Sequence, residues 1–88
     1  MKPLYTRLFK KDFAKRLEGT RMEAEFEELL GLLLSGAPLP SAYCDHPLVG
    51  KWKGYRDCHL RGDMVVIYRV EGDMIYFTRI NSHSELFD

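Results

Sequence analysis

Apolar residues recur at helical spacing between Met22 and Leu33, at positions i, i+4, i+7, i+8 and i+11. That spacing gathers them on one face of an α-helix. Thr20 and Glu23 stand where a capping box places them, with the threonine hydroxyl bonding the N3 amide and the glutamate reaching back to the cap. Gly36 suits the left-handed residue that ends a helix. We therefore predict a helix between Thr20 and Gly36.

Two shorter elements precede this helix. The residues from Leu4 to Phe9 alternate loosely between apolar and polar side chains, which predicts an opening strand. Phe13 and Leu17 then stand at i and i+4 in the segment KKDFAKRL, which predicts a short amphipathic helix that ends at Gly19.

Beyond residue 36 the pattern changes to short apolar runs between turn residues. Residues 37–47 carry three prolines and are expected to form a loop. Residues 55–60, 64–70 and 74–80 are predicted strands, joined by turns that contain glycine. The run MVVIYRV is apolar on both faces, as a central strand should be. The chain is therefore expected to be an α+β domain of order β-α-α-β-β-β, whose N-terminal strand and two helices pack on one face of a small antiparallel sheet. The other face is left free for function.

The length and charge narrow the function classes. The chain has 88 residues, enough for one domain spanning 1–88, and its 13 basic and 13 acidic side chains give a formal net charge of zero. Net positive charge alone therefore does not predict binding to nucleic acid. No secretory signal or membrane-spanning run is visible, and Cys44 and Cys58 form no CxxC pair. We expect a cytoplasmic protein with reduced thiols and no membrane partner; a Cys44–Cys58 disulfide is the alternative.

The charged residues are unevenly distributed along the chain, although their total is balanced. The segment 51–61 holds four full positive charges against one carboxylate, with two aromatic residues among them. Cations that meet phosphates and rings that stack on bases are what binding to single-stranded nucleic acid requires. An ordinary exposed strand with a core tryptophan would look the same. The candidate RNA contacts in this segment are Lys51, Trp52, Lys53, Arg56 and Arg61.

All three histidines, His46, His59 and His83, lie in the second half of the chain. Histidine is the side chain that titrates near neutral pH, so the three are candidates for proton transfer. No HExxH or paired-cysteine spacing is present, so the sequence predicts neither a metal site nor a cofactor.

Arg79 is a further candidate. It follows Ile75 and Phe77 at a spacing of two, so we expect it to share their side of the strand, either as an edge residue or as a cation placed in a cleft. His83 follows four residues later. An arginine that stabilises charge on phosphate oxygens beside a histidine that moves a proton suits phosphoryl chemistry.

An ordered set of residues in the second half resembles the YafQ branch of the RelE/ParE toxin superfamily, the toxins of bacterial type II toxin–antitoxin systems. The matching residues are Asp45-His46-Pro47-Leu48, Gly50, Trp52-Lys53-Gly54-Tyr55-Arg56-Asp57, His59, Asp63, Ile67-Tyr68, Arg79, Ser82-His83 and Leu86-Phe87. The chain departs from the pattern at two points. Met64 stands where the family usually has a tryptophan, and the pI of about 6.8 is lower than is typical of these basic toxins.

The resemblance implies a ribosome-dependent endoribonuclease that cuts messenger RNA in the A site by attack of the 2′-hydroxyl, without a metal. It implies that His83 is the general acid and that Arg79 stabilises the transition state. His46, His59 or Asp63 would accept the 2′-proton or hold the RNA. Phe87 and Trp52 would contact a base.

The resemblance leaves two other functions open. A ParE-like toxin would block DNA gyrase without cutting RNA, and a catalytically degenerate relative would only bind its antitoxin. The histidines argue against the gyrase inhibitor, because an inhibitor has no use for proton-transfer groups. The toxin functions imply ribosome and messenger RNA as partners, together with an antitoxin, in a heterotetramer of two toxin–antitoxin pairs.

Overall fold

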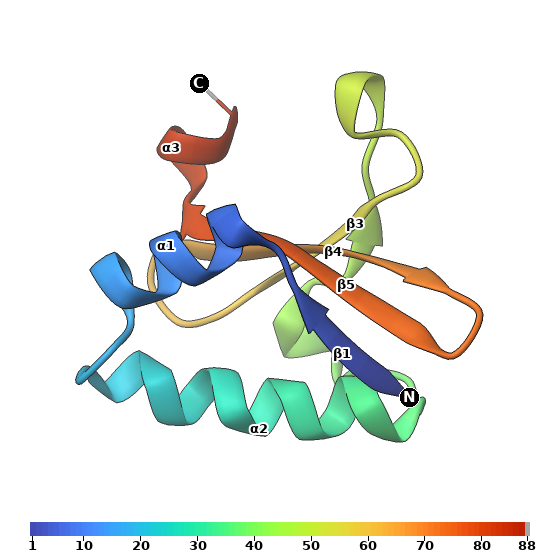
Figure 1. Cartoon of the computed structure of the whole chain (residues 1–88), viewed down its shortest axis with the longest axis horizontal. Coiled ribbons are helices and arrows are strands. Elements are labelled where there is room, and N and C mark those ends of the chain that lie inside the picture. Colours follow the sequence, from blue (N-terminus) through green and yellow to red (C-terminus); the bar gives the residue numbers. More distant parts are fainter. Residues whose placement is uncertain (88) are drawn as a thin grey trace.

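The computed structural model describes residues 1–87 of the chain (Figure 1). Its elements are β1 (Lys2–Tyr5), α1 (Arg7–Arg16), α2 (Arg21–Ser35), the 3₁₀ turn η1 (Ser41–Tyr43), β2 (His46–Pro47), the 3₁₀ turn η2 (Gly50–Trp52), β3 (Arg56–His59), β4 (Met64–Glu71), β5 (Met74–Ser82) and α3 (His83–Phe87). The predicted α+β class is confirmed. No helix within residues 1–87 is long and apolar enough to cross a membrane.

The first strand and helix begin earlier than the sequence pattern indicated. Thr6 separates them, because its hydroxyl accepts a hydrogen bond from the backbone N–H of Phe9 and so caps α1. The second helix begins after Thr20, as predicted, but the threonine hydroxyl accepts from the N–H of Met22 rather than from that of Glu23. Gly36 ends this helix with a left-handed φ of 75°, as expected.

The strands form one sheet in the order β1-β5-β4-β3-β2, with the apolar β4 in the middle as predicted. The sheet is mixed rather than wholly antiparallel. β1 pairs parallel to β5, with Lys2 opposite Met74 and Tyr5 opposite Phe77. Hairpins impose antiparallel pairing on neighbours such as β4 and β5, whereas β1 reaches β5 from the far end of the chain.

Helices α1 and α2 cover one face of the sheet, and the main core lies between them and the sheet (Figure 1). Phe9, Phe26 and Phe77 meet at its centre with ring centroids 5.5 to 5.7 Å apart. We call the opposite side of the sheet the open face. A smaller apolar cluster of Val65, Ile67 and Leu86 lies there.

The end of the chain differs from the prediction of a short polar tail. β5 continues to Ser82, and α3 follows at once on the open face (Figure 1). The Ser82 hydroxyl accepts a hydrogen bond from the N–H of Glu85, and Leu86 is buried against the cluster on the open face. The predicted loop at 37–47 likewise contains the short strand β2, which pairs with β3.

A bulge in β5 changes the side on which Arg79 lies. Tyr68 stands opposite Phe77, but the next residue back along β4, Ile67, stands opposite Arg79, so Thr78 is an extra residue. Phe77 therefore faces the helices while Arg79 shares the open face with Ile67. The expectation that Arg79 lies on the side of Ile75 and Phe77 is wrong, because alternation along a strand is interrupted by a bulge.

Candidate functional site

The register of the sheet aligns residues from four strands on the open face, the candidates His46 and Arg79 among them. His46 of β2 stands opposite Asp57 of β3, Asp57 opposite Ile67 of β4, and Ile67 opposite Arg79 of β5. Because directly paired residues point to the same face of a sheet, these four side chains form one row across it. His59 lies on the same face, two residues along β3 from Asp57.

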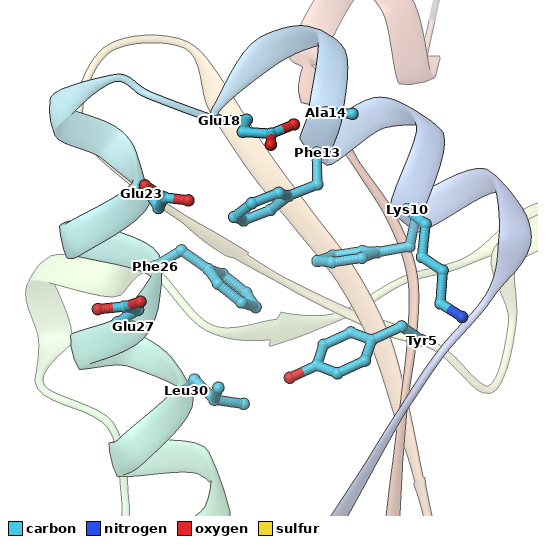
Figure 2. Close-up of a pocket in the computed structure, with 10 residues that line it drawn as sticks. Tyr5, Lys10, Phe13, Ala14, Glu18, Glu23, Phe26, Glu27 and Leu30 are labelled. Carbon is cyan, nitrogen blue, oxygen red and sulfur yellow. The ribbon is translucent and has the colours of Figure 1, made fainter.

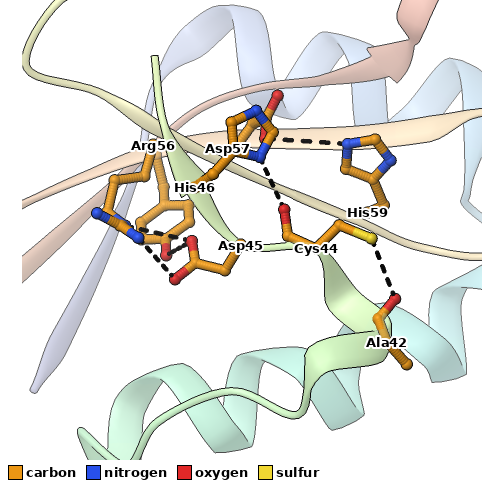
Figure 3. A network of polar contacts seen from close by, with 8 residues as sticks. Ala42, Cys44, Asp45, His46, Arg56, Asp57 and His59 are labelled. Atoms are coloured by element: carbon orange, nitrogen blue, oxygen red, sulfur yellow. Dashed lines mark hydrogen bonds and ion pairs between the residues drawn. The ribbon is translucent and has the colours of Figure 1, made fainter.

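His46, Asp57 and His59 form a polar cluster at one end of this row (Figure 3). The Nδ1 atom of His46 lies 2.8 Å from the carbonyl oxygen of Cys44 and 2.9 Å from Oδ1 of Asp57. The Nε2 atom of His59 lies 3.9 Å from the same Oδ1. The Asp57 side chain is 4% exposed, against 53% and 35% for the two histidines. The imidazoles therefore meet solvent while the carboxyl lies beneath them.

The buried carboxyl of Asp57 is electrostatically unusual. Burial raises its pKa above the ordinary value for aspartate, and the charges of His46 and His59 oppose that rise. Although His46 is close, Oδ1 receives no well-aligned hydrogen bond from any residue in the described range. An aspartate with a raised pKa beside two histidines is an arrangement suited to moving protons, and sequence reasoning did not select Asp57 for it.

His83 stands at the start of α3, beside this cluster. Its backbone N–H donates to the carbonyl oxygen of Asp63 at 3.0 Å, and its ring lies 4.9 Å from that of Phe87 between centroids. The charge of His83 acts on Asp57, which brings it within electrostatic reach of the row. The side chain of Asp63 is exposed on the turn before β4, so this residue meets His83 through its backbone.

Arg79 is held by a residue that the sequence did not single out. Its Nε lies 2.7 Å and its Nη2 3.0 Å from the carboxylate oxygens of Asp12 on α1. The same carboxylate accepts from the N–H of Ile80 and from the side-chain amide of Asn81, each at 3.2 Å. Burial by itself would raise the pKa of Asp12, but these hydrogen bonds and the Arg79 charge outweigh it and lower the pKa. A lone acid among the cations of KKDFAKRL was the only signal for it.

The basic residues of segment 51–61 do not all reach the open face. Arg56 stands opposite Tyr68, on the side that the helices cover, and donates to both oxygens of Asp45 at 3.3 and 3.2 Å (Figure 3). Arg61 lies 3.6 Å from Glu25 on α2. Both arginines therefore pair with acidic side chains in the folded chain, and their contact with RNA stays a prediction.

The remaining candidates in that segment lie nearer the open face. Lys51 and Lys53 are exposed on and after η2. Trp52 packs against the open-face cluster, with its ring 5.4 Å from that of Tyr55 and roughly perpendicular to it. Its indole N–H is buried without a hydrogen-bond partner among residues 1–87. Trp52 is therefore part of the apolar packing on the open face, and it also lies at the border of that face.

A cleft on the helix side of the molecule is a different kind of site. It is lined by the aromatic side chains of Tyr5, Phe9, Phe13 and Phe26. The acidic side chains of Glu18, Glu23 and Glu27 line it as well (Figure 2). None of the residues that line it is a histidine, so the proton-transfer groups lie outside this cleft. In the described part of the chain, no group of three or more His, Cys, Asp or Glu side chains is placed to hold a metal ion.

Comparison with known proteins gives consistent matches. All 88 residues match a family described as "Bacterial toxin of type II toxin-antitoxin system, YafQ". The putative toxin YafQ of Haemophilus influenzae is 45% identical over 78 residues, which cover 84% of this chain and 76% of that protein. The mRNA interferase toxin YafQ of Escherichia coli (strain B / BL21-DE3) is 36% identical over 84 residues, covering 94% and 91% of the two chains. YafQ in the crystal structure of the E. coli DinJ–YafQ complex is similar with a TM-score of 0.87 and 34% identity, over 98% of this chain and 97% of that one.

Proposed function

The chain belongs to the YafQ family of bacterial toxins of type II toxin–antitoxin systems, and from this premise we propose that it is an mRNA interferase. It cuts messenger RNA in the A site of the ribosome, without a metal ion, and residues 1–88 act as one toxin domain. The observation that carries the proposal is the row of His46, Asp57 and Arg79 across the open face, with His59 and His83 beside it.

The reaction begins with attack of the ribose 2′-oxygen on the adjacent phosphorus. A bond forms between these atoms and the bond from phosphorus to the 5′-oxygen breaks, which leaves a 2′,3′-cyclic phosphate and a 5′-hydroxyl. One proton must leave the 2′-hydroxyl and another must reach the 5′-oxygen. Paired proton donors and acceptors are what this chemistry requires, and histidine serves in both directions near neutral pH.

His83 donates the proton to the leaving 5′-oxygen. Its ring is exposed at the start of α3, next to Phe87, where a nucleotide can reach both. His46, His59 or Asp63 accepts the 2′-proton or holds the RNA. The two histidines are the better supported candidates for the base, because the buried carboxyl of Asp57 lies directly beneath them and the side chain of Asp63 stands apart on a turn.

Arg79 stabilises the negative charge that grows on the non-bridging phosphate oxygens. Within residues 1–87 its side chain bonds to Asp12 alone, through two of the guanidinium N–H groups, and the rest stay available. Such a preorganised donor is worth more in the transition state than in the ground state. Phe87, Trp52, Lys51 and Lys53 border the same face and contact the bases and phosphates of the bound message.

An antitoxin protein is the expected partner, since the YafQ of the E. coli complex is bound to the antitoxin DinJ. We propose that two toxin–antitoxin pairs of this protein assemble as a heterotetramer. Size-exclusion chromatography with light scattering, on the toxin co-expressed with the antitoxin encoded beside it, tests that stoichiometry. A single 1:1 pair would refute it.

The activity is tested by mapping message ends after the protein is added to a translating extract. We expect new ends within codons, carrying a 5′-hydroxyl, and a loss of about 10²- to 10⁴-fold in cleavage rate for His83→Ala. Ser84→Ala, on the same exposed turn of α3, is the matched control and should keep the wild-type rate. Cleavage of naked message at the same rate would refute ribosome dependence, and loss of activity with a transition-metal chelator would refute the metal-free route. Intact messages together with stalled gyrase would establish the ParE-like alternative instead.

A further inference from the structure

We propose that Asp12 is a positioning residue for Arg79, which fixes the plane of the guanidinium so that its remaining N–H groups meet the phosphate under attack. The inference rests on the proposed function, in which Arg79 stabilises the transition state. Asp12 itself lies on α1, outside the row of residues on the open face, and its side chain bonds to Arg79, Ile80 and Asn81 rather than to a histidine.

The geometry of the contact is that of a two-point clamp. Nε of Arg79 donates to one oxygen of Asp12 at 2.7 Å and Nη2 donates to the other at 3.0 Å. Two parallel hydrogen bonds between a guanidinium and a carboxylate fix orientation as well as distance, because both groups are planar. The guanidinium therefore cannot swing away from this plane without breaking one of them.

The carboxylate is in turn fixed by the edge of the sheet. β1 stops pairing with β5 at Phe77, and the backbone N–H of Ile80 further along that edge donates to Asp12 at 3.2 Å. The side-chain amide of Asn81 donates to the other oxygen at 3.2 Å. The Asp12 side chain is 9% exposed, so packing also restrains it. Asp12 thus takes the place of a missing neighbouring strand and presents a rigid acceptor to Arg79.

The bulge at Thr78 explains why the Arg79 side chain needs to be restrained. It turns Arg79 to the open face, opposite Ile67, while α1 lies along the edge of β5. The Arg79 side chain is 25% exposed, so it has freedom to adopt other rotamers if nothing holds it. With Asp12 in place, the guanidinium N–H groups of Arg79 that do not bond to the carboxylate keep one orientation.

The test measures kcat and KM on programmed ribosomes for the wild type, Asp12→Ala, Arg79→Ala and the double variant. We expect Asp12→Ala to lower kcat about 10- to 100-fold with KM nearly unchanged, because a misplaced group costs rate rather than binding. In the Arg79→Ala background the same substitution should have almost no further effect on kcat, because the two residues act as a unit. Asp12→Asn keeps the shape and one acceptor oxygen, and it replaces the alanine variant if that one does not fold.

Two further measurements separate positioning from support of the fold. Phe9→Leu, at another buried position on the same helix, should lower stability yet keep the wild-type kcat. The Nε–H resonance of Arg79 in a ¹⁵N spectrum should be sharp and slowly exchanging in the wild type, and should broaden in Asp12→Asn. Both results are expected only if the carboxylate acts through the guanidinium.

The outcomes that overturn the inference are distinct from those that overturn the function. An active wild type together with an equally active, folded Asp12 variant refutes the role of Asp12 alone. An equal loss of kcat in the wild-type and Arg79→Ala backgrounds shows a purely structural role and also refutes it. A wild type that leaves the message uncut refutes the proposed function and the role of Asp12 with it.

Discussion

Replacing Asp57 by asparagine should make the folded protein more stable and the proposed enzyme slower. The Asp57 side chain is 4% exposed, and its Oδ1 accepts no aligned hydrogen bond from the residues that the structure describes. Leaving a buried polar group without a partner costs roughly 1–3 kcal/mol, and a charged group costs more. The asparagine side chain has the same shape and is still polar, but it removes the additional cost of the charge, so we expect Asp57→Asn to gain on the order of 1 kcal/mol in the free energy of unfolding at pH 7.

The sign of the pH dependence follows from the direction of the shift. Burial raises the pKa of Asp57 in the folded state, so the folded protein binds a proton there that the unfolded chain has already released. The stability associated with this group is fully present below the unfolded pKa of about 3.9 and is lost as pH rises through the folded pKa. The advantage of the asparagine variant should therefore be small near pH 3.5 and should grow toward pH 7.

Urea unfolding of both proteins at a series of pH values from about 3.5 to 8 measures this advantage directly. For a domain of 88 residues, each 1 kcal/mol should also shift the melting temperature by roughly 4–8 °C. Message cleavage should fall in the same variant, because His46 and His59 lose the carboxyl that lies beside them. A variant that is less stable than the wild type at pH 7, by an amount that does not change with pH, would refute the reasoning.

Three other predictions concern stability. Asp12→Asn should lower the free energy of unfolding by about 1–3 kcal/mol at pH 7, because buried hydrogen bonds are lost. Since the pKa of Asp12 is lowered in the folded state, this difference in stability should shrink in urea titrations as pH falls below about 4. A difference that persists at low pH would contradict the clamp. Gly31→Ala should stabilise α2 by about 0.5–1 kcal/mol, since a Cβ added at Gly31 would meet nothing within 4 Å in the described structure, whereas Gly36→Ala should destabilise the protein by about 1 kcal/mol because φ is 75° there. Equal melting temperatures for the two variants would refute the contrast. Phe77→Ala should cost roughly 3–5 kcal/mol in denaturant unfolding, because this fully buried ring is packed against Tyr5, Phe9 and Phe26, and a cost below about 1 kcal/mol would mean that this cluster is not the core.

The local signals in the sequence were sufficient for most of the fold. The spacing from Met22 to Leu33, with Thr20 and Gly36 at its ends, determined α2, because each of these signals acts within a few residues of the chain. The apolar run 64–70 identified the central strand correctly, since a strand with neighbours on both edges and layers on both faces buries consecutive side chains, as β4 does from Met64 to Tyr68. The His46, His59 and His83 candidates came from residue type and order, and the register of the sheet brings His46 and His59 together.

The side on which Arg79 lies could not be read from its spacing. A single extra residue, Thr78, reverses the alternation along β5, and no local property of the sequence marks that position as a bulge. The sequence also could not show how the charges of Arg56 and Arg61 are paired, because their acidic partners Asp45 and Glu25 lie in other segments of the chain. A basic run in the sequence therefore does not establish a basic surface.

What the sequence determined by itself was the main helices and strands, the class of fold and the residue types available for chemistry, because helix and strand periodicity and turn residues are local properties; β2 and α3 lay outside its reach. What only the tertiary structure decided was which of those residues share one face and which hold one another. Asp12 and Arg79 are 67 positions apart, and Asp57 became notable only when burial raised its pKa beside two histidines. Both features depend on long-range packing and on removal from water, and these arise only when distant segments come together in the folded chain.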